Sequence, residues 1–459
     1  MSNIFQLIKD ALQGDEDRDY TSISINKAIF YLSIPMVIEM SFEALFALAD
    51  AFFVARYVGT IGVAAVGLTE SVLTLIYSVA FGLSGAATAI IARRIGEKNY
   101  PGASTALAQV ILVSVILGLL IAITGYHYAE KILELMGGTS ELIAQGKWYT
   151  KIQFLSSPII ILIFTLSGAL RGSGNASLAM RSVIIANILN IALDYLFIPV
   201  MGLGIKGAAI ATIIGRSVGV SYQLWALLNV RSRLRVLFSD FKPLKEILLN
   251  IIKVGSGGAG QFLIQSASWV FLVRILSIYG NEVIAGYTIA LRIIVFTILP
   301  SWGLANSAAT LVGQNLGAGK PERAIKSAWM VSYFNMAFLA VVAVFFFIFA
   351  DAFIAWFDPT PQVVTTGALC LKILAAGYIL FGVGMVITQA INGAGDTLAP
   401  TIFNLICFWA IEIPLAYYMA VILDWKETGV FLSIIIAETF LAAMAIIYFK
   451  SNRWQKVKV

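Results

Sequence analysis

The sequence predicts an all-α integral membrane protein with twelve transmembrane helices, arranged as two six-helix lobes related by a parallel internal repeat. Of its 459 residues, 59% are hydrophobic and only 12% are charged, half the roughly 25% of ordinary soluble domains. The mean hydropathy is +0.89. The apolar runs are long and lack a two-residue alternation, so they predict helices rather than the strands of a membrane barrel.

Glycine, proline and charged residues divide the apolar runs into segments that can cross a bilayer, which takes about 20 residues of helix. Two of these breaks are residues 96–101 and 317–321, where glycine, lysine and proline gather. The predicted helices are 25–56, 61–92, 102–126, 143–171, 177–200, 205–228, 246–278, 282–314, 325–350, 362–391, 399–422 and 428–449.

A glycine pattern predicts that the two halves of the chain are homologous. Gly59, Gly96, Gly172 and Gly174 recur as Gly280, Gly317, Gly393 and Gly395, each 221 residues later. Six helices per half is an even number, so both halves enter the membrane from the same side, as in parallel repeats. The predicted parts are an N-terminal segment (1–24), an N-lobe (25–228), a linker (229–245), a C-lobe (246–450) and a tail (451–459).

Positive charge predicts the orientation of the helices. If both termini face the cytoplasm, 21 of the 31 Lys and Arg residues fall on that side and seven on the opposite side. Because Lys and Arg concentrate in cytoplasmic loops, both termini are predicted to be cytoplasmic. The net charge of +6 is assigned to orientation, and no nucleic-acid-binding module is found.

The first helix carries an acidic face. Glu39, Glu43 and Asp50 lie four and eleven residues apart, which places them on roughly one side of a helix. Because carboxylates facing lipid are costly, this side is expected to face protein or a water-filled cavity. Pro35 removes a backbone hydrogen bond and predicts a bend. The helix is therefore interpreted as a moving part, and the alternative is a kinked helix whose polar groups are satisfied.

A second polar group lies on the fifth and sixth helices. Asn190 and Asp194 are four residues apart on one face, and Thr212 offers a hydroxyl in an apolar setting. Their oxygens suit a proton relay or a Na⁺ ion, and the alternative for Asn190 and Thr212 is hydrogen bonding between helices. Burial disfavours a charged carboxylate, so gain or loss of a proton at Asp50 or Asp194 would bias helix packing.

Other intramembrane charges leave several pairings open. Glu412 precedes Pro414 and is a secondary cavity candidate together with Glu39 and Glu43. Glu70 and Glu438 each have Arg292 or Arg216 as an alternative partner, and the partner of Lys372 is also undetermined. The sequence contains no Walker motif, HExxH pattern or metal-ligand spacing, so neither an enzyme nor a cofactor is expected.

Residues 50–59, Asp-Ala-Phe-Phe-Val-Ala-Arg-Tyr-Val-Gly, and 64–68, Ala-Ala-Val-Gly-Leu, resemble the first-helix signature of the multidrug and toxic compound extrusion (MATE) family. The resemblance covers residues 25–450 and is greatest to the prokaryotic DinF-like branch. It implies two lobes in a V that alternate access, and export of varied, often cationic organic compounds in exchange for H⁺ or Na⁺. It further implies a monomer in the bacterial cytoplasmic (inner) membrane, with lipids and small organic substrates as partners.

In the DinF-like branch, an aspartate and a proline on helix 1 work with an Asn-x-x-x-Asp pair on helix 5 and a threonine on helix 6. The matching residues are Asp50, Pro35, Asn190, Asp194 and Thr212. The norfloxacin-transporting branch has acids on helices 7 and 10.

Here helix 7 offers Gln261 and Gln265, and the predicted helix 10 contains no acid. This departure places ion coupling in the N-lobe. The alternative function is a flippase for lipids or lipid-linked oligosaccharides from the same superfamily; the acidic cavity candidates favour the exporter.

Overall fold

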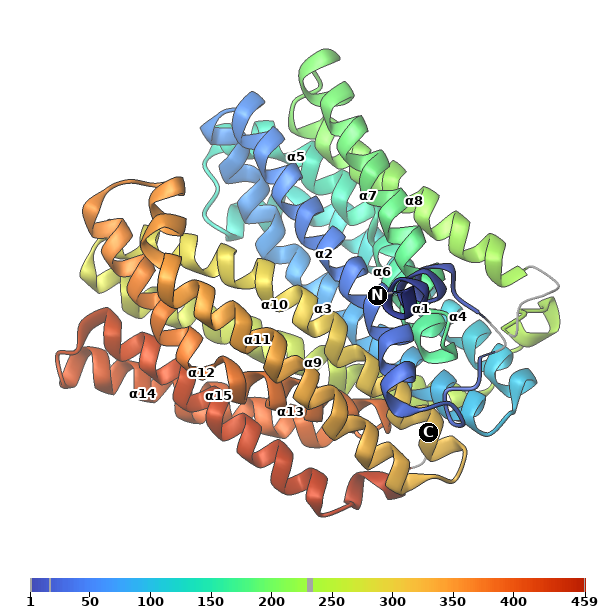
Figure 1. Ribbon diagram of the computed structural model, residues 1–459. Helices are drawn as coiled ribbons and strands as arrows, with labels where there is room; N and C mark the ends of the chain where they lie inside the picture. Colours follow the sequence, from blue (N-terminus) through green and yellow to red (C-terminus); the bar gives the residue numbers. More distant parts are fainter. Residues whose placement is uncertain (1, 16–17, 229–233, 458) are drawn as a thin grey trace.

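The computed structural model describes residues 2–15, 18–228, 234–457 and 459, and all regular structure in them is helical (Figure 1). The first half contains α1 (Ser2–Gln13), α2 (Ile25–Tyr57), α3 (Thr60–Gly96), α4 (Tyr100–Leu135), α5 (Ser140–Leu155), α6 (Ser157–Ser173), α7 (Ala176–Tyr195), the π-helical turn η1 (Leu196–Val200) and α8 (Ile205–Leu228).

The second half begins with the 3₁₀ turn η2 (Phe238–Phe241), followed by α9 (Lys245–Leu276), the 3₁₀ turn η3 (Ser277–Tyr279), α10 (Asn281–Gly317), α11 (Pro321–Phe357) and α12 (Pro361–Gly393). It ends with α13 (Leu398–Asn404), the π-helical turn η4 (Leu405–Glu412), α14 (Ile413–Tyr417), the π-helical turn η5 (Tyr418–Ile422), α15 (Lys426–Lys450) and the 3₁₀ turn η6 (Arg453–Lys456).

These elements confirm an all-α integral membrane fold. Nine helices of the described chain are long and apolar enough to cross a membrane, or ten when α5 and α6 count as one span bent by 44°. The polar helices α2 and α8 lie outside this set, so the count of twelve stays a prediction. Residues 1, 16–17 and 229–233, which belong to the predicted N-terminal segment and linker, lie outside the described residues.

Backbone geometry supports the internal repeat. Gly174 and its counterpart Gly395 both have left-handed φ values, +95° and +93°, as do Gly59 (+86°) and Gly280 (+110°). A Cβ atom at Gly96 would collide with the backbone of Gln314, and one at Gly317 with that of Arg93, the repeat equivalent of Gln314. The ends of α3 and α10 therefore approach each other in a symmetric way that only glycine permits.

The wide π-helical turns also repeat, with a change of spacing. Met201 N–H donates to the carbonyl of Leu196 at the end of η1, and Leu423 N–H donates to that of Tyr418 at the end of η5. These pairs are 222 residues apart, whereas the glycines are 221 apart. The second half therefore has one residue more between Gly395 and Tyr418, the interval that contains η4.

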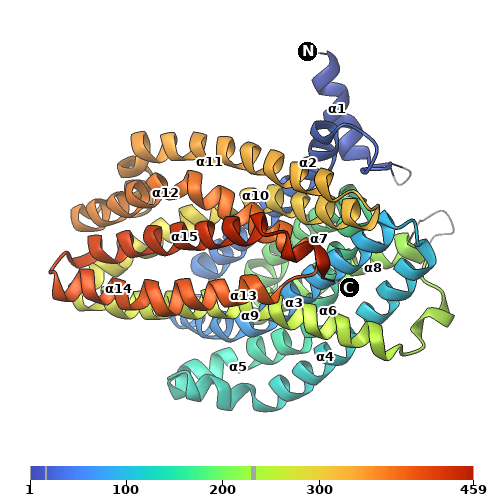
Figure 2. The same ribbon diagram turned by 90° about the horizontal axis from the view of Figure 1, so that it is seen from below.

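The two lobes pack together at one end of the helices, where α2 begins and α15 ends; this is the terminal end (Figures 1 and 2). A core cluster there joins Ile29 and Leu32 of α2 to Leu311 and Val312 of α10. Thr310 Oγ1 donates to the carbonyl of Arg171 at 3.1 Å, and Gln314 Nε2 donates to that of Gly172 at 2.9 Å. Toward the opposite end, α2 and α10 diverge in Figure 1 and carry exposed residues such as Phe52 and Phe296.

Candidate functional site

The predicted coupling residues gather inside the N-lobe, on α2, α7 and α8. Asp50 is 8% exposed and Asp194 is fully buried, and the two carboxyl groups interact electrostatically. Asn190 Nδ2 donates to Thr212 Oγ1 at 3.3 Å, and Thr212 Oγ1 donates to the carbonyl of Ala208 at 3.0 Å. We call Asp50, Asn190, Asp194 and Thr212 the N-lobe cluster.

Several oxygens of the N-lobe cluster lack a donor. Oδ1 of Asp50, Oδ1 of Asn190 and both carboxylate oxygens of Asp194 are buried without a hydrogen-bond partner in the described chain. Buried polar groups are nearly always paired, and an unpaired group is costly. This set of carboxylate and amide oxygens has the chemistry to take up a proton or a hard cation. Groups of three or more His, Cys, Asp or Glu placed to hold a metal ion are absent from the described residues.

A buried arginine lies next to the N-lobe cluster. The guanidinium of Arg216 interacts electrostatically with Asp50 and Glu43. Its Nη2 donates to the hydroxyl of Tyr77 at 3.2 Å. Its charge also lies 5.3 Å from the ring centre of Phe46 and 5.9 Å from that of Phe164. Aromatic faces attract a desolvated cation, so this cage stabilises a positive charge beside the acids of α2.

Glu39 is engaged in an ion pair rather than free. Oε1 of Glu39 lies 2.5 Å from Nη1 of Arg171, and both side chains are buried. Nη2 of Arg171 donates to Ser84 Oγ at 2.9 Å, so the pair joins α2, α6 and α3. The sequence analysis placed Arg171 at a helix end and did not identify this role; the structure extends α6 beyond it, to Ser173.

The C-lobe has a neutral counterpart of this ion pair. Gln261 Nε2 donates to Asn392 Oδ1 at 3.1 Å, and Asn392 Nδ2 donates to Gln261 Oε1 at 3.1 Å. Asn392 stands 221 residues after Arg171. Gln261 therefore joins α9 to α12 without charge, and the half-buried Gln265 follows one turn later on α9.

Glu412 lies in the C-lobe, apart from the N-lobe cluster. It ends η4 and is buried, and its Oε2 has no hydrogen-bond partner among the described residues. Glu438 on α15 interacts with it electrostatically. Among the charges whose pairing was undetermined, Lys372 Nζ lies 2.6 Å from Asp351 at the surface, and Glu70 interacts electrostatically with Arg292.

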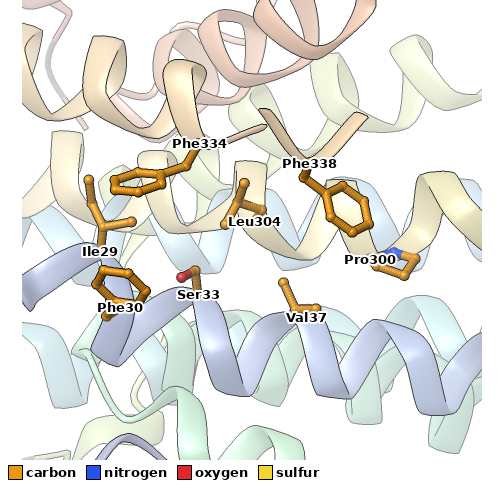
Figure 3. Close-up of a pocket in the computed structure, with 8 residues that line it drawn as sticks. All are labelled: Ile29, Phe30, Ser33, Val37, Pro300, Leu304, Phe334 and Phe338. Carbon is orange, nitrogen blue, oxygen red and sulfur yellow. The ribbon is translucent and has the colours of Figure 1, made fainter. Parts of the chain in front are cut away.

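A small apolar cavity of about 150 Å³ lies where α2 faces α10 and α11. Figure 3 shows Ser33 and Val37 on α2 opposite Pro300 and Leu304 on α10. Drug-sized ligands occupy about 300–1,000 Å³, so the cavity is too small for such a substrate. Its place beside Pro35 leaves free volume next to the turn of α2 that lacks a backbone hydrogen bond.

Comparison with known proteins gives the same family for both halves of the chain. The MatE family model matches residues 35–196 and 259–418. The probable multidrug resistance protein YpnP of Bacillus subtilis is 24% identical over 96% of this chain and 98% of its own. The probable multidrug resistance protein NorM of Thermotoga maritima is 26% identical over 98% of this chain and 97% of its own.

Among solved structures, an outward-facing multidrug resistance MATE family transporter of the MOP superfamily superposes with a TM-score of 0.89. It is 27% identical and covers 96% of this chain and 97% of its own. Sequence and architecture agree over nearly the whole length, which confirms the resemblance of the first helix. The chain is a multi-pass membrane protein that belongs to the MATE family.

Proposed function

We propose that the protein is a secondary active antiporter that exports organic, often cationic and amphiphilic compounds in exchange for H⁺ or Na⁺. The names of its relatives, multidrug resistance proteins, support the export of organic compounds. The unpartnered, buried oxygens of the N-lobe cluster carry the proposal for ion coupling. No residue is assigned a catalytic role.

In this proposal, ion occupancy of the N-lobe cluster controls the packing of α2. A proton or Na⁺ ion compensates the carboxylates of Asp50 on α2 and Asp194 on α7, with Asn190 and Thr212 supplying further oxygens. When the ion leaves, two like charges remain in the protein interior within interacting distance. Their repulsion favours a repacking of α2, and Pro35 is the position at which we expect α2 to bend.

The proposal takes both termini as cytoplasmic in a bacterial inner membrane. In that orientation the terminal end faces the cytoplasm, and the contacts of Thr310 and Gln314 with the N-lobe seal it. The arrangement is then outward-facing. Exchange between this arrangement and one open at the terminal end provides alternating access, with one six-helix lobe moving against the other.

The test is uptake of a fluorescent organic cation into inverted membrane vesicles, with a pH gradient and a Na⁺ gradient imposed separately. We expect Asp50→Asn and Asp194→Asn to reach the membrane at wild-type levels and to lose uptake. Asp424→Asn is the matched control, because Asp424 is exposed and its φ of +55° is one that asparagine adopts.

Full uptake by Asp50→Asn would contradict the proposed coupling site. The gradient that drives wild-type uptake identifies the coupling ion. Translocation of a labelled lipid by reconstituted protein, without cation uptake, would instead support the alternative of a lipid or lipid-linked oligosaccharide flippase.

A further inference from the structure

The segment that leads into α2 crosses the junction between the lobes at the terminal end. We call residues 19–23 the strap. The side chain of Tyr20 is 3% exposed, and its hydroxyl donates to the carbonyl of Gly174 at 3.1 Å. Gly174 lies in the turn between α6 and α7, and a Cβ atom there would be 2.6 Å from Cε2 of Tyr20. The strap is thus fitted to the N-lobe by shape and by a hydrogen bond.

The backbone of the same strap is bound by the C-lobe. Lys320 Nζ donates to the carbonyl of Thr21 at 2.9 Å. Arg323 Nη2 donates to the carbonyl of Tyr20 at 3.2 Å and also to that of Ile23. Both cations lie where α11 begins. Hydrogen bonds from charged donors are roughly twice as strong as neutral ones, so the C-lobe holds three carbonyls of the strap firmly.

Local hydrogen bonds fix the shape of the strap. Oδ1 of Asp19 accepts from the backbone N–H of Thr21 at 2.9 Å and from its hydroxyl at 2.7 Å. Ser22 Oγ donates to the carbonyl of Asp19 at 3.0 Å. These bonds close a turn that points the carbonyls toward Lys320 and Arg323. The strap therefore transmits force between the lobes instead of acting as a slack connection.

We propose that the strap is a latch that stabilises the closed terminal end and must release from one lobe before that end opens. This inference rests on the alternating access of the proposed function. When the lobes separate there, the strap cannot keep both Tyr20 against Gly174 and its carbonyls against Lys320 and Arg323. Closure is then favoured by contacts that belong to neither the ion site nor the substrate path.

The test measures the distance between spin labels on opposite lobes at the terminal end. Glu97 and Lys326 are exposed there and receive the labels, after the two buried cysteines, Cys370 and Cys407, are replaced by alanine. Arg323→Gln and, independently, Lys320→Gln are expected to raise the ratio of open to closed distances by about tenfold, the order set by one charged hydrogen bond. Lys320 is exposed, so its substitution leaves the core intact.

Arg181→Gln is the matched control. Nη2 of Arg181 donates to the carbonyls of Leu12 and Gln13, so this change removes equivalent bonds between α7 and the end of α1 without touching the C-lobe. The latch is wrong if Arg323→Gln and Lys320→Gln keep the wild-type distances, or if Arg181→Gln shifts them equally. A wild type with one distance under every ion and substrate condition would contradict the proposed transport cycle, whereas the variants alone decide the latch.

Discussion

The buried ion pair between Glu39 and Arg171 predicts a large loss of stability in Glu39→Gln. The two side chains are only 2% and 8% exposed, and their charged atoms lie 2.5 Å apart. When one partner is removed, the other charge stays in a medium of low dielectric constant without compensation. Breaking a buried pair in this way costs about 3–5 kcal/mol, because the hydrogen bond from Arg171 to Ser84 does not replace a carboxylate.

Thermal unfolding of the purified protein in detergent provides the assay. For Glu39→Gln we expect the unfolding midpoint to fall by roughly 5 °C. Asp351→Asn is the matched control, because it breaks an ion pair with Lys372 whose side chains are 62% and 36% exposed. Exposed pairs contribute about 0–1 kcal/mol, so the control should unfold close to the wild-type midpoint.

A double variant separates the loss of the pair from the effect of an orphaned charge. Glu39→Gln combined with Arg171→Asn reproduces the neutral chemistry of Gln261 and Asn392 in the C-lobe. Because neither charge is then left alone, the double variant should be more stable than Glu39→Gln, and the single effects should not add. An unchanged midpoint for Glu39→Gln, or strictly additive losses, would refute the reasoning.

Three further outcomes are expected. Gly96→Ala and Gly317→Ala should each destabilise the closed terminal end, because the new Cβ would collide with the backbone of the opposite lobe; more open spin-label distances would show this. Burial raises the pKa of Asp19, but hydrogen bonds from Thr21 and two nearby lysine charges outweigh burial and hold it below its usual 3.8. Its stabilisation of the strap is therefore complete at neutral pH and is lost only as the pH falls below that value, so this carboxylate should cause no change in label distance between roughly pH 8 and pH 5. Pro35→Ala should restore a backbone hydrogen bond in α2 and slow cation uptake in vesicles, while an unaffected rate would argue against a bend there.

The helices and the repeat could be predicted from sequence because their signals are local or strictly periodic. Long apolar runs identify the helices, and a constant spacing of 221 residues between glycines identifies the halves. The later structure explains these glycines physically, because Gly96 and Gly317 pack against the backbone of the opposite lobe. The predicted helices are mostly too short at their ends, as at α11, which runs from Pro321 to Phe357 rather than over 325–350.

The choice of partners could not be predicted, because it depends on how distant helices cross. Glu39 and Glu43 lie on one face of α2, yet Glu39 meets Arg171 whereas Glu43 lies within electrostatic range of Arg216. A pairing between Arg216 and either Glu70 or Glu438 was left open, and Arg216 is instead bonded to Tyr77. The strap was also missed, since its bonds are made by backbone carbonyls that any sequence supplies.

The wide turn η4 has a consequence for the charge of the second lobe. In a regular helix, one added residue would rotate everything beyond it by about 100° and turn inward side chains toward the lipid. The π-helical turn accommodates the additional residue, so η5 still closes its helix as η1 does 222 positions earlier. By the same count Glu412 answers Asn190, and both are buried. A single insertion thus leaves two architecturally matched lobes with an ionisable group in one and an amide in the other.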